Sequence, residues 1–177
     1  MVTIVFEAHG TTFDNEQHLS SGHFDVALSP LGIRQSKEMG ERYKDDQFEA
    51  IMCSDLQRSY QSAEIAFGNR FQIIRDARLR ECDYGDMTQK PSEIVDSEKL
   101  NRIYVPFTNG ESYEQTTERM RSFLEYLVKR FDNRRVMIIG HRATQYALEN
   151  LINGIPLEEI IPALWKWQPG WKYELNK

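Results

Sequence analysis

The sequence predicts an α/β domain in which a parallel-type sheet is covered by helices on both faces. Short apolar and β-branched segments alternate with longer segments of helical periodicity, as expected for strands joined by helical connections. The length of 177 residues suits one domain with a sizeable core and is short for two. We therefore predict that residues 1–177 form a single domain.

The composition is that of an ordinary globular protein, with 28% charged and 40% hydrophobic residues. No apolar run reaches the roughly 18 residues of a membrane span. The N-terminus lacks the basic and apolar regions of a secretory signal. The net charge of −5 argues against nucleic-acid binding and means that an anionic substrate needs a local concentration of arginine. We expect a cytoplasmic protein with neither a nucleic-acid nor a membrane partner.

Two predicted strands end at a histidine. Residues 2–6 are a β-branched and apolar run, and Gly10 marks a sharp turn one residue after His9. Residues 135–140 form a second run of this kind, which His141 follows directly. Ligands of open α/β sheets gather at the carboxyl ends of the strands. Two histidines in matching positions are hard to obtain from packing alone, so they predict a functional site.

Serine residues mark the starts of three predicted helices. Ser29 suits the N-cap, with Pro30 at the first helical position. Ser54 and Ser112 each lie three residues before a glutamine, which is the spacing of a capping box. These helices are predicted to end near residues 43, 67 and 131. The apolar stripe over residues 120–131 is interpreted as core and not as a cofactor site.

The remaining elements complete the alternation of strands and helices. Strands are predicted over residues 48–53 and 71–75, and residues 171–175 alternate as a final edge strand. Further helices are predicted from Pro91 to about Arg102, from His141 through residue 151, and over one turn at 157–161.

Four polar residues collect at the predicted carboxyl edge of the sheet: His9, Arg58, Glu81 and His141. A neutral imidazole can attack a phosphoryl group and become phosphohistidine. Arginine and a second histidine can neutralise the spread negative charge of the transferring group. A carboxylic acid can protonate the leaving alkoxide and then activate water as a base. This set therefore predicts phosphoryl transfer.

Several motifs follow one another in an order shared with a known family. They are Ala8-His9-Gly10-Thr11-Thr12 with Asn15; Gly22, Asp25, Leu28, Ser29, Gly32 and Gln35; Ser54-Asp55-Leu56 with Arg58, Gln61, Ser62 and Ala63; Leu79-Arg80-Glu81 with Gly85; Gly110-Glu111-Ser112; and His141. Over nearly the whole chain, this pattern resembles the histidine phosphatase superfamily, which includes the cofactor-dependent phosphoglycerate mutases. The resemblance implies a three-layer α/β/α sandwich with a mostly parallel central sheet, and a site that uses no metal and no cofactor.

The resemblance also implies roles for individual residues. His9 would be the nucleophile, Glu81 the acid and base, and Arg58 and His141 the phosphoryl-binding pair. The further candidates for phosphate or substrate binding are Asn15, Gly22 and Arg142. The implied activity is hydrolysis of a small phosphorylated metabolite, with residues 86–110 covering the site. Mutase activity is not expected because the mutases carry extra segments, and a homodimer is a possible assembly.

The sequence departs from the family pattern next to the nucleophile. The arginine that precedes the family's nucleophile is Ala8 here, whether natural or engineered. Thr11, Leu19 and Arg142 stand where the family usually has a glutamate, an arginine and a glycine. Loss of one charge-assisted donor is worth on the order of 3 kcal/mol, or about a hundredfold in rate. Arg142 either fills the vacancy or faces solvent.

Two alternatives compete with the phosphatase. A catalytically weak or inactive family member that binds a phosphorylated ligand or protein is favoured by Ala8. A metal site built from the histidines would include His18 and His23, which lie five apart on a polar loop, but no His-Glu-x-x-His pattern is present.

Tryptophans and cysteines leave two smaller questions open. Trp165, Trp167 and Trp171 either line a pocket or, as we prefer, pack the C-terminal segment. Cys53 lies in an apolar strand and is expected to be inert, whereas Cys82, beside Glu81, is either inert or reactive. Two cysteines provide neither a disulfide framework nor a zinc spacing.

Overall fold

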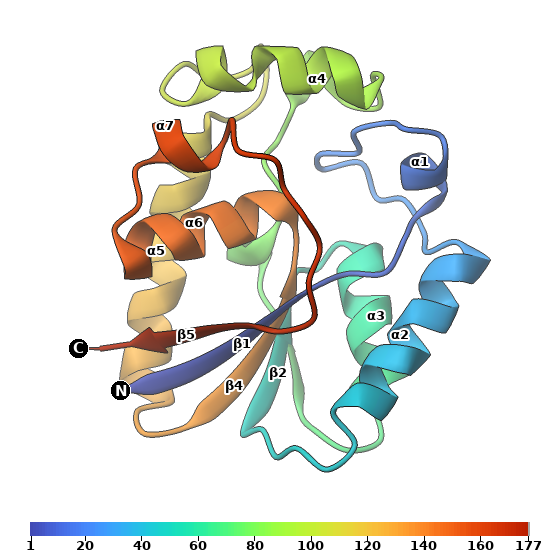
Figure 1. Ribbon diagram of the computed structural model, residues 1–177, viewed down its shortest axis with the longest axis vertical. Coiled ribbons are helices and arrows are strands. Elements are labelled where there is room, and N and C mark those ends of the chain that lie inside the picture. The colour runs from blue at the N-terminus through green and yellow to red at the C-terminus, as the bar shows by residue number, and fades with distance from the viewer. Residues whose placement is uncertain (177) are drawn as a thin grey trace.

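The computed structural model describes residues 1–176 and shows a five-stranded sheet between two layers of helices (Figure 1). The strands are β1 (Val2–Ala8), β2 (Ala50–Cys53), β3 (Ile73–Arg75), β4 (Arg135–Gly140) and β5 (Trp171–Leu175). Their order is β3-β2-β4-β1-β5, and only the β1–β5 pair in this sheet is antiparallel. The prediction of an α/β/α sandwich with a mostly parallel sheet is confirmed.

Two pairs of helices cover the sheet. They are α2 (Pro30–Arg42) with α3 (Gln57–Phe67) on one face, and α5 (Tyr113–Arg130) with α6 (Arg142–Asn153) on the other. Alternation along β1 explains this, because Ile4 and Phe6 join the core under α5 while Val5 joins the core under α2 and α3. In residues 1–176 we find no helix with the length and apolar character of a membrane span.

Shorter elements lie at the carboxyl edge of the sheet. They are α1 (Phe13–Glu16), α4 (Ser92–Glu98), α7 (Leu157–Ile160) and 3₁₀ turns at Ala77–Leu79, Gly85–Met87 and Lys99–Arg102. The segment over residues 86–110, which contains α4, forms a cap at this edge. Its apolar side chains, including Val95 and Phe107, pack on Tyr146 of α6. On its other side, the amide of Ser92 donates to the carbonyl of His18 (2.8 Å). The cap therefore contacts α6 on one side and the loop that contains His18 on the other.

The register between β1 and β4 sets the positions of the two histidines. Ala8 pairs with Gly140, so His9 and His141 leave the sheet at the same level on neighbouring strands. The amide of His9 donates to the carbonyl of Gly140 (3.1 Å). The turn after His9 needs glycine, because a Cβ on Gly10 would lie 2.5 Å from the carbonyl oxygen of Gly32. The loop thus packs directly against the start of α2.

The predicted capping box at Ser54 is wrong. α3 begins at Gln57, and its N-cap residue, Leu56, makes no side-chain capping bond. The Ser54 hydroxyl lies instead 2.7 Å from Nε2 of His141. The caps at Ser29 and Ser112 are confirmed. The predicted helix from Pro91 divides into α4 and a 3₁₀ turn. The sequence analysis missed α1, which begins with a capping box between Thr12 and Asn15.

Candidate active site

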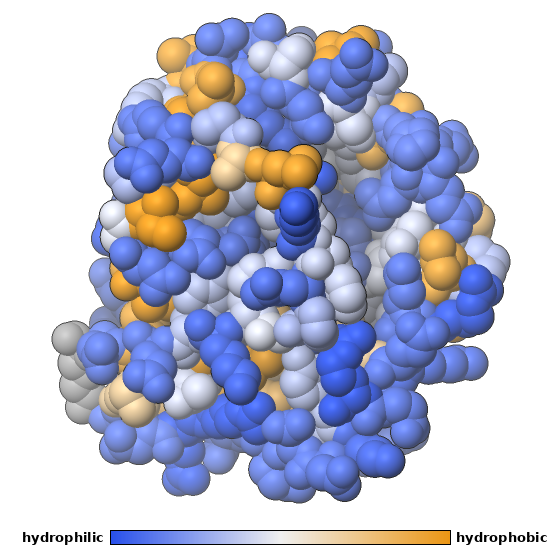
Figure 2. Space-filling view, viewed as in Figure 1, coloured by the Kyte–Doolittle hydropathy of each residue, from blue (hydrophilic) through white to orange (hydrophobic). Residues whose placement is uncertain are grey.

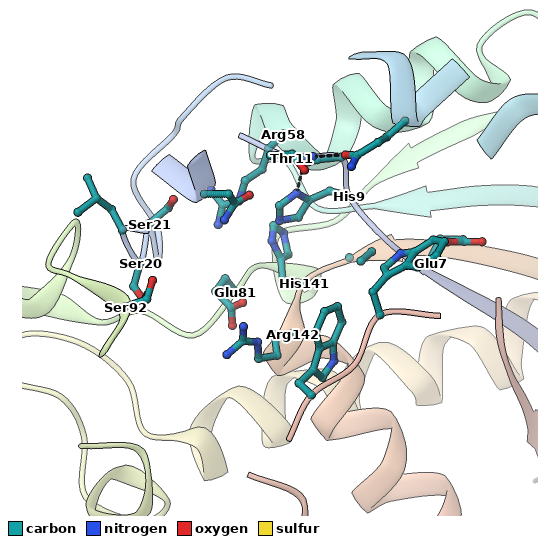
Figure 3. A pocket seen from close by; sticks show the side chains of 18 of the residues that line it. Glu7, His9, Thr11, Ser20, Ser21, Arg58, Glu81, Ser92, His141 and Arg142 are labelled. Carbon is teal, nitrogen blue, oxygen red and sulfur yellow. Dashed lines mark hydrogen bonds between the residues drawn. The ribbon is translucent and has the colours of Figure 1, made fainter. Parts of the chain in front are cut away.

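The carboxyl edge of the sheet opens into a cavity of about 540 Å³ under the cap. Its lining includes every predicted site residue, namely His9, Asn15, Gly22, Arg58, Glu81, His141 and Arg142. Figure 3 shows the two imidazoles near its centre, with Arg58 on one side of them and Glu81 and Arg142 on the other. Residues from four separate stretches of the chain thus face one space.

His9 is held in one protonation state by its own loop. Its Nδ1 lies 2.7 Å from the carbonyl oxygen of Gly10. A carbonyl oxygen can only accept, so Nδ1 carries the proton and Nε2 carries the lone pair. Removal from water, and then the charge of Arg58, lower the pKa of His9 to about 3. The imidazole is therefore neutral at pH 7, which is the form that can attack phosphorus.

Arg58 brings a buried positive charge to the pocket. It lies in the first turn of α3, and only 2% of it is exposed. Its guanidinium donates to the carbonyls of Phe24 (2.9 Å) and Gly22 (2.7 Å). These two bonds leave three of its five N–H donors available. Gly22, predicted as a phosphate contact, lines the pocket and also holds this arginine.

His141 is oriented by Ser54. The Ser54 hydroxyl accepts from the amide of Leu56 (3.4 Å), so its own proton is available for Nε2 of His141. In that arrangement Nδ1 of His141 carries the ring proton. Nδ1 is buried and has no partner in residues 1–176. Burial and the nearby Arg58 hold the pKa of His141 well below its usual value, so the ring is neutral.

Glu81 presents one of its two carboxylate oxygens to the pocket. The other, Oε1, accepts from the amides of Cys82 (2.8 Å) and Ala143 (3.1 Å), the latter in the first turn of α6. Within residues 1–176, Oε2 has no hydrogen-bond partner. These bonds fix the carboxyl group and leave Oε2 able to exchange a proton with a ligand.

Ala8 and Arg142 both line the pocket, but they face different surroundings. The Arg142 guanidinium lies 3.5 Å from the Asp96 carboxylate of α4 and 5.5 Å from the centre of the Trp165 ring. It therefore pairs with the cap, which neither of the two sequence-based alternatives anticipated. Asn15 lines the pocket and uses its Oδ1 to cap α1.

Comparison with known families decides the identity of the fold. Residues 4–165 match the model of the histidine phosphatase superfamily (branch 1). The chain belongs to this superfamily.

Similar superfamily members include several phosphatases. The uncharacterized phosphatase PhoE of Bacillus subtilis is 32% identical over 157 residues, which cover 87% of this chain and 79% of that protein. Phosphoserine phosphatase 1 of Hydrogenobacter thermophilus is 27% identical, with 90% and 80% covered. The structure of a mycobacterial glucosyl-3-phosphoglycerate phosphatase with VO3 aligns with a TM-score of 0.78 and 26% identity, covering 92% of this chain and 87% of that one.

Sequence reasoning missed part of the pocket lining. The missed lining residues that carry charges or hydroxyls include Glu7, Ser20, Ser21, Glu38, Arg42, Ser92 and Asp96. Glu7 is almost completely buried and accepts from Tyr43 (2.7 Å) and Arg42 (2.9 Å). A glutamate next to an apolar strand was the signal that could have revealed this group. Nothing in the sequence pattern indicated Asp96.

The structure resolves the questions on tryptophan and cysteine. Trp165 and Trp167 both line the pocket, while Trp165 also stacks on Trp171 with ring centres 5.7 Å apart. The preferred packing role is therefore confirmed for Trp165 and Trp171, and the pocket alternative holds for Trp165 and Trp167. Cys82 is fully buried and burial raises the pKa of its thiol, so the reactive alternative is also wrong. Burial likewise raises the pKa of Cys53 to about 12.

The metal alternative gains no support from the geometry. His23 lies with Nε2 2.8 Å from the carbonyl oxygen of Glu81, and neither His18 nor His23 lines the pocket. Over residues 1–176, no group of three or more His, Cys, Asp or Glu side chains is arranged to hold a metal ion.

Proposed function

We propose that the protein hydrolyses a small phosphorylated metabolite through a phosphohistidine intermediate on His9, as a phosphoric monoester hydrolase. One observation carries the proposal: the Nδ1–H of His9 donates to Gly10, which leaves the Nε2 lone pair free in the pocket that holds Arg58 and His141. Membership of a superfamily with phosphatase relatives supports the same activity.

In the proposed first step, Nε2 of His9 attacks phosphorus and the bond to the ester oxygen breaks. Protonated Glu81 gives its proton to that oxygen, so the leaving group departs as an alcohol. The unused donors of Arg58 and Nδ1–H of His141 stabilise the charge on the transferring phosphoryl oxygens. The products of this step are phosphohistidine, the alcohol and the Glu81 carboxylate.

In the second step, the Glu81 carboxylate takes a proton from water as the water oxygen attacks phosphorus. The bond between Nε2 and phosphorus breaks, and its electron pair returns to the imidazole. Inorganic phosphate leaves, and Glu81 is again protonated. Both steps use only groups that line the pocket.

A catalytically weak or inactive protein that binds a phosphorylated ligand is the second candidate, and Ala8 is the observation that favours it. Release of inorganic phosphate from a panel of phosphate monoesters by the purified protein separates the two. Release well above the uncatalysed rate supports the phosphatase. Binding of the same esters without release supports the second candidate.

Restoring an arginine at position 8 is expected to tighten phosphate binding. Ala8 lines the pocket, whereas Arg142 is paired with Asp96. The guanidinium of an arginine at position 8 would therefore not be repelled by a second guanidinium at the same place. A hydrogen bond to a charged group is worth about 1.5–3 kcal/mol, so Ala8→Arg should lower the Kd for phosphate or vanadate by about tenfold to a hundredfold.

The measurement compares wild type, Ala8→Arg, Arg142→Ala and the double variant by calorimetry. Arg142→Ala alone should leave phosphate affinity within about twofold of wild type. Loss of affinity in Arg142→Ala that Ala8→Arg rescues would instead place Arg142 on the phosphate. No change in any variant would show that position 8 does not face the phosphate.

Removing the Ser54 hydroxyl is expected to lower kcat by about fivefold, which corresponds to one hydrogen bond of roughly 1 kcal/mol. In Ser54→Ala, Nε2 of His141 loses its partner, and the ring is free to move its proton away from Nδ1. Nitrogen NMR of the His141 ring reports the tautomer directly, and Ser54→Thr should retain the wild-type spectrum and rate. An unchanged tautomer and an unchanged kcat in Ser54→Ala would contradict this role.

A further inference from the structure

We infer that the substrate carries no negatively charged group besides its phosphoryl group, and that its leaving group is neutral and bears hydroxyls, as a polyol or a sugar does. The inference rests on the proposed function and concerns the same pocket. It follows from how the charged side chains of the pocket are paired.

Two of the three arginines in the pocket are already engaged. Arg42 donates to the buried Glu7 carboxylate (2.9 Å) and lies over Trp167. Arg142 faces Asp96, whose carboxylate also binds the ammonium group of the buried Lys99. Arg58 is the one pocket arginine in residues 1–176 that forms no ion pair, because it donates to backbone carbonyls. One unpaired cation suits one phosphoryl group.

The total charge of the pocket agrees with this pairing. Four carboxylates line it, those of Glu7, Glu38, Glu81 and Asp96, against three arginines. Lys99, behind Asp96, raises the cations to four. By formal charge, the four carboxylates therefore equal the four cations. A phosphate monoester carries a charge of about −1.5 to −2 at pH 7, so the pocket has no surplus positive charge for an anionic group beyond the phosphoryl group.

A second anion would have to break an existing ion pair to be accommodated. It would displace Asp96 from Arg142 and Lys99, or Glu7 from Arg42. The displaced carboxylate would lose its cationic partner and lie next to the new anion, and this repulsion disfavours binding of a second anion. The pocket therefore selects against a carboxylate or a second phosphate on the substrate.

The groups near Glu81 suit hydroxyls instead. Figure 3 places Ser20 and Ser92 on one side of Glu81, and Arg142 beside it. The two serine hydroxyls lie 3.2 Å apart, and each retains lone pairs for a further bond. Trp165 also lines the pocket, and its buried Nε1–H has no partner in the described residues. Figure 2 shows hydrophilic side chains along part of the rim of the hollow on this face, with hydrophobic residues at its upper edge.

Two esters that differ at one carbon test the inference. Glycerol 3-phosphate and 3-phosphoglycerate share the phosphoryl group and the secondary hydroxyl, but one ends in a hydroxymethyl group and the other in a carboxylate. For wild type, kcat/KM for glycerol 3-phosphate should exceed that for 3-phosphoglycerate by at least about tenfold. Inhibition constants of both esters against 4-nitrophenyl phosphate hydrolysis give the same comparison when turnover is slow.

The variant Asp96→Asn should shift this preference. It releases Arg142 and Lys99 from their shared carboxylate, so the ratio should move toward 3-phosphoglycerate by about tenfold or more. Glu93→Gln removes one exposed carboxylate from the same helix outside the pocket and is the matched control, with an unchanged ratio.

Each outcome has a separate meaning. Equal efficiency for the two esters, or a preference for 3-phosphoglycerate, overturns the inference while leaving the phosphatase activity in place. An unchanged ratio in Asp96→Asn also overturns it. Absence of turnover for both esters and for 4-nitrophenyl phosphate removes the proposed function itself.

Discussion

Replacement of His9 by alanine is expected to reduce phosphate release to the uncatalysed background. The proposed covalent route needs the Nε2 lone pair, and no other pocket side chain among residues 1–176 presents a neutral imidazole with a free Nε2. The assay is steady-state release of phosphate from 4-nitrophenyl phosphate. The control is His18→Asn, which changes an exposed histidine outside the pocket at a left-handed position that asparagine tolerates.

The thermal stability of His9→Ala shows whether lost activity reflects the missing nucleophile or an unfolded protein. The His9 side chain faces the pocket, and its one hydrogen bond is to the adjacent residue. We therefore expect the thermal midpoint of His9→Ala to stay close to that of wild type. Full activity in a folded His9→Ala protein would refute the mechanism.

Glu81→Gln is expected to lower kcat for alkyl phosphate esters by about a hundredfold to ten-thousandfold, the range for general acid–base catalysis. Glutamine keeps an oxygen for the amides of Cys82 and Ala143 but carries no transferable acid proton. The first step with 4-nitrophenyl phosphate should suffer less, because nitrophenolate is a good leaving group without protonation. The second step should remain slow, since water lacks its base.

Stopped-flow measurement of nitrophenolate checks this prediction. Glu81→Gln should show a fast burst close to one equivalent of enzyme, followed by slow turnover. Glu93→Gln, on the exposed side of α4, is the control and should behave as wild type. Equal losses for alkyl and nitrophenyl esters, without a burst, would assign Glu81 a role other than acid and base.

The sequence was sufficient to predict the two histidines because strand patterns are local. Each follows a buried apolar run, and parallel neighbours end at the same edge of a sheet. Arg58 was likewise predicted at that edge, because it follows a strand directly and lies in the first turn of the next helix. The pairing of Ala8 with Gly140, which brings the imidazole centres to 5.0 Å, required the register of β1 against β4. A single sequence does not specify that register.

The missed contacts join side chains that are far apart in the sequence. The local sequence predicts that Ser54 caps a helix. In the structure, its hydroxyl instead forms a hydrogen bond with His141, which lies 87 residues away. Asp96 lies on the exposed side of a weakly amphipathic cap helix, and it meets Arg142 only after the cap has packed. Local propensity therefore gave a wrong role for the first and none for the second.

Trapping of the phosphoenzyme shows whether His9 carries the phosphoryl group. Glu81→Gln is mixed with 4-nitrophenyl phosphate that carries a radiolabelled phosphoryl group, and the reaction is stopped in alkali, where phosphohistidine survives. We expect nearly one label per chain, on the peptide that contains His9. This label should be lost on acid treatment and absent from the double variant His9→Ala with Glu81→Gln. Label on another residue, or a nitrophenolate burst in Glu81→Gln with no label above the double variant, would contradict the phosphohistidine mechanism.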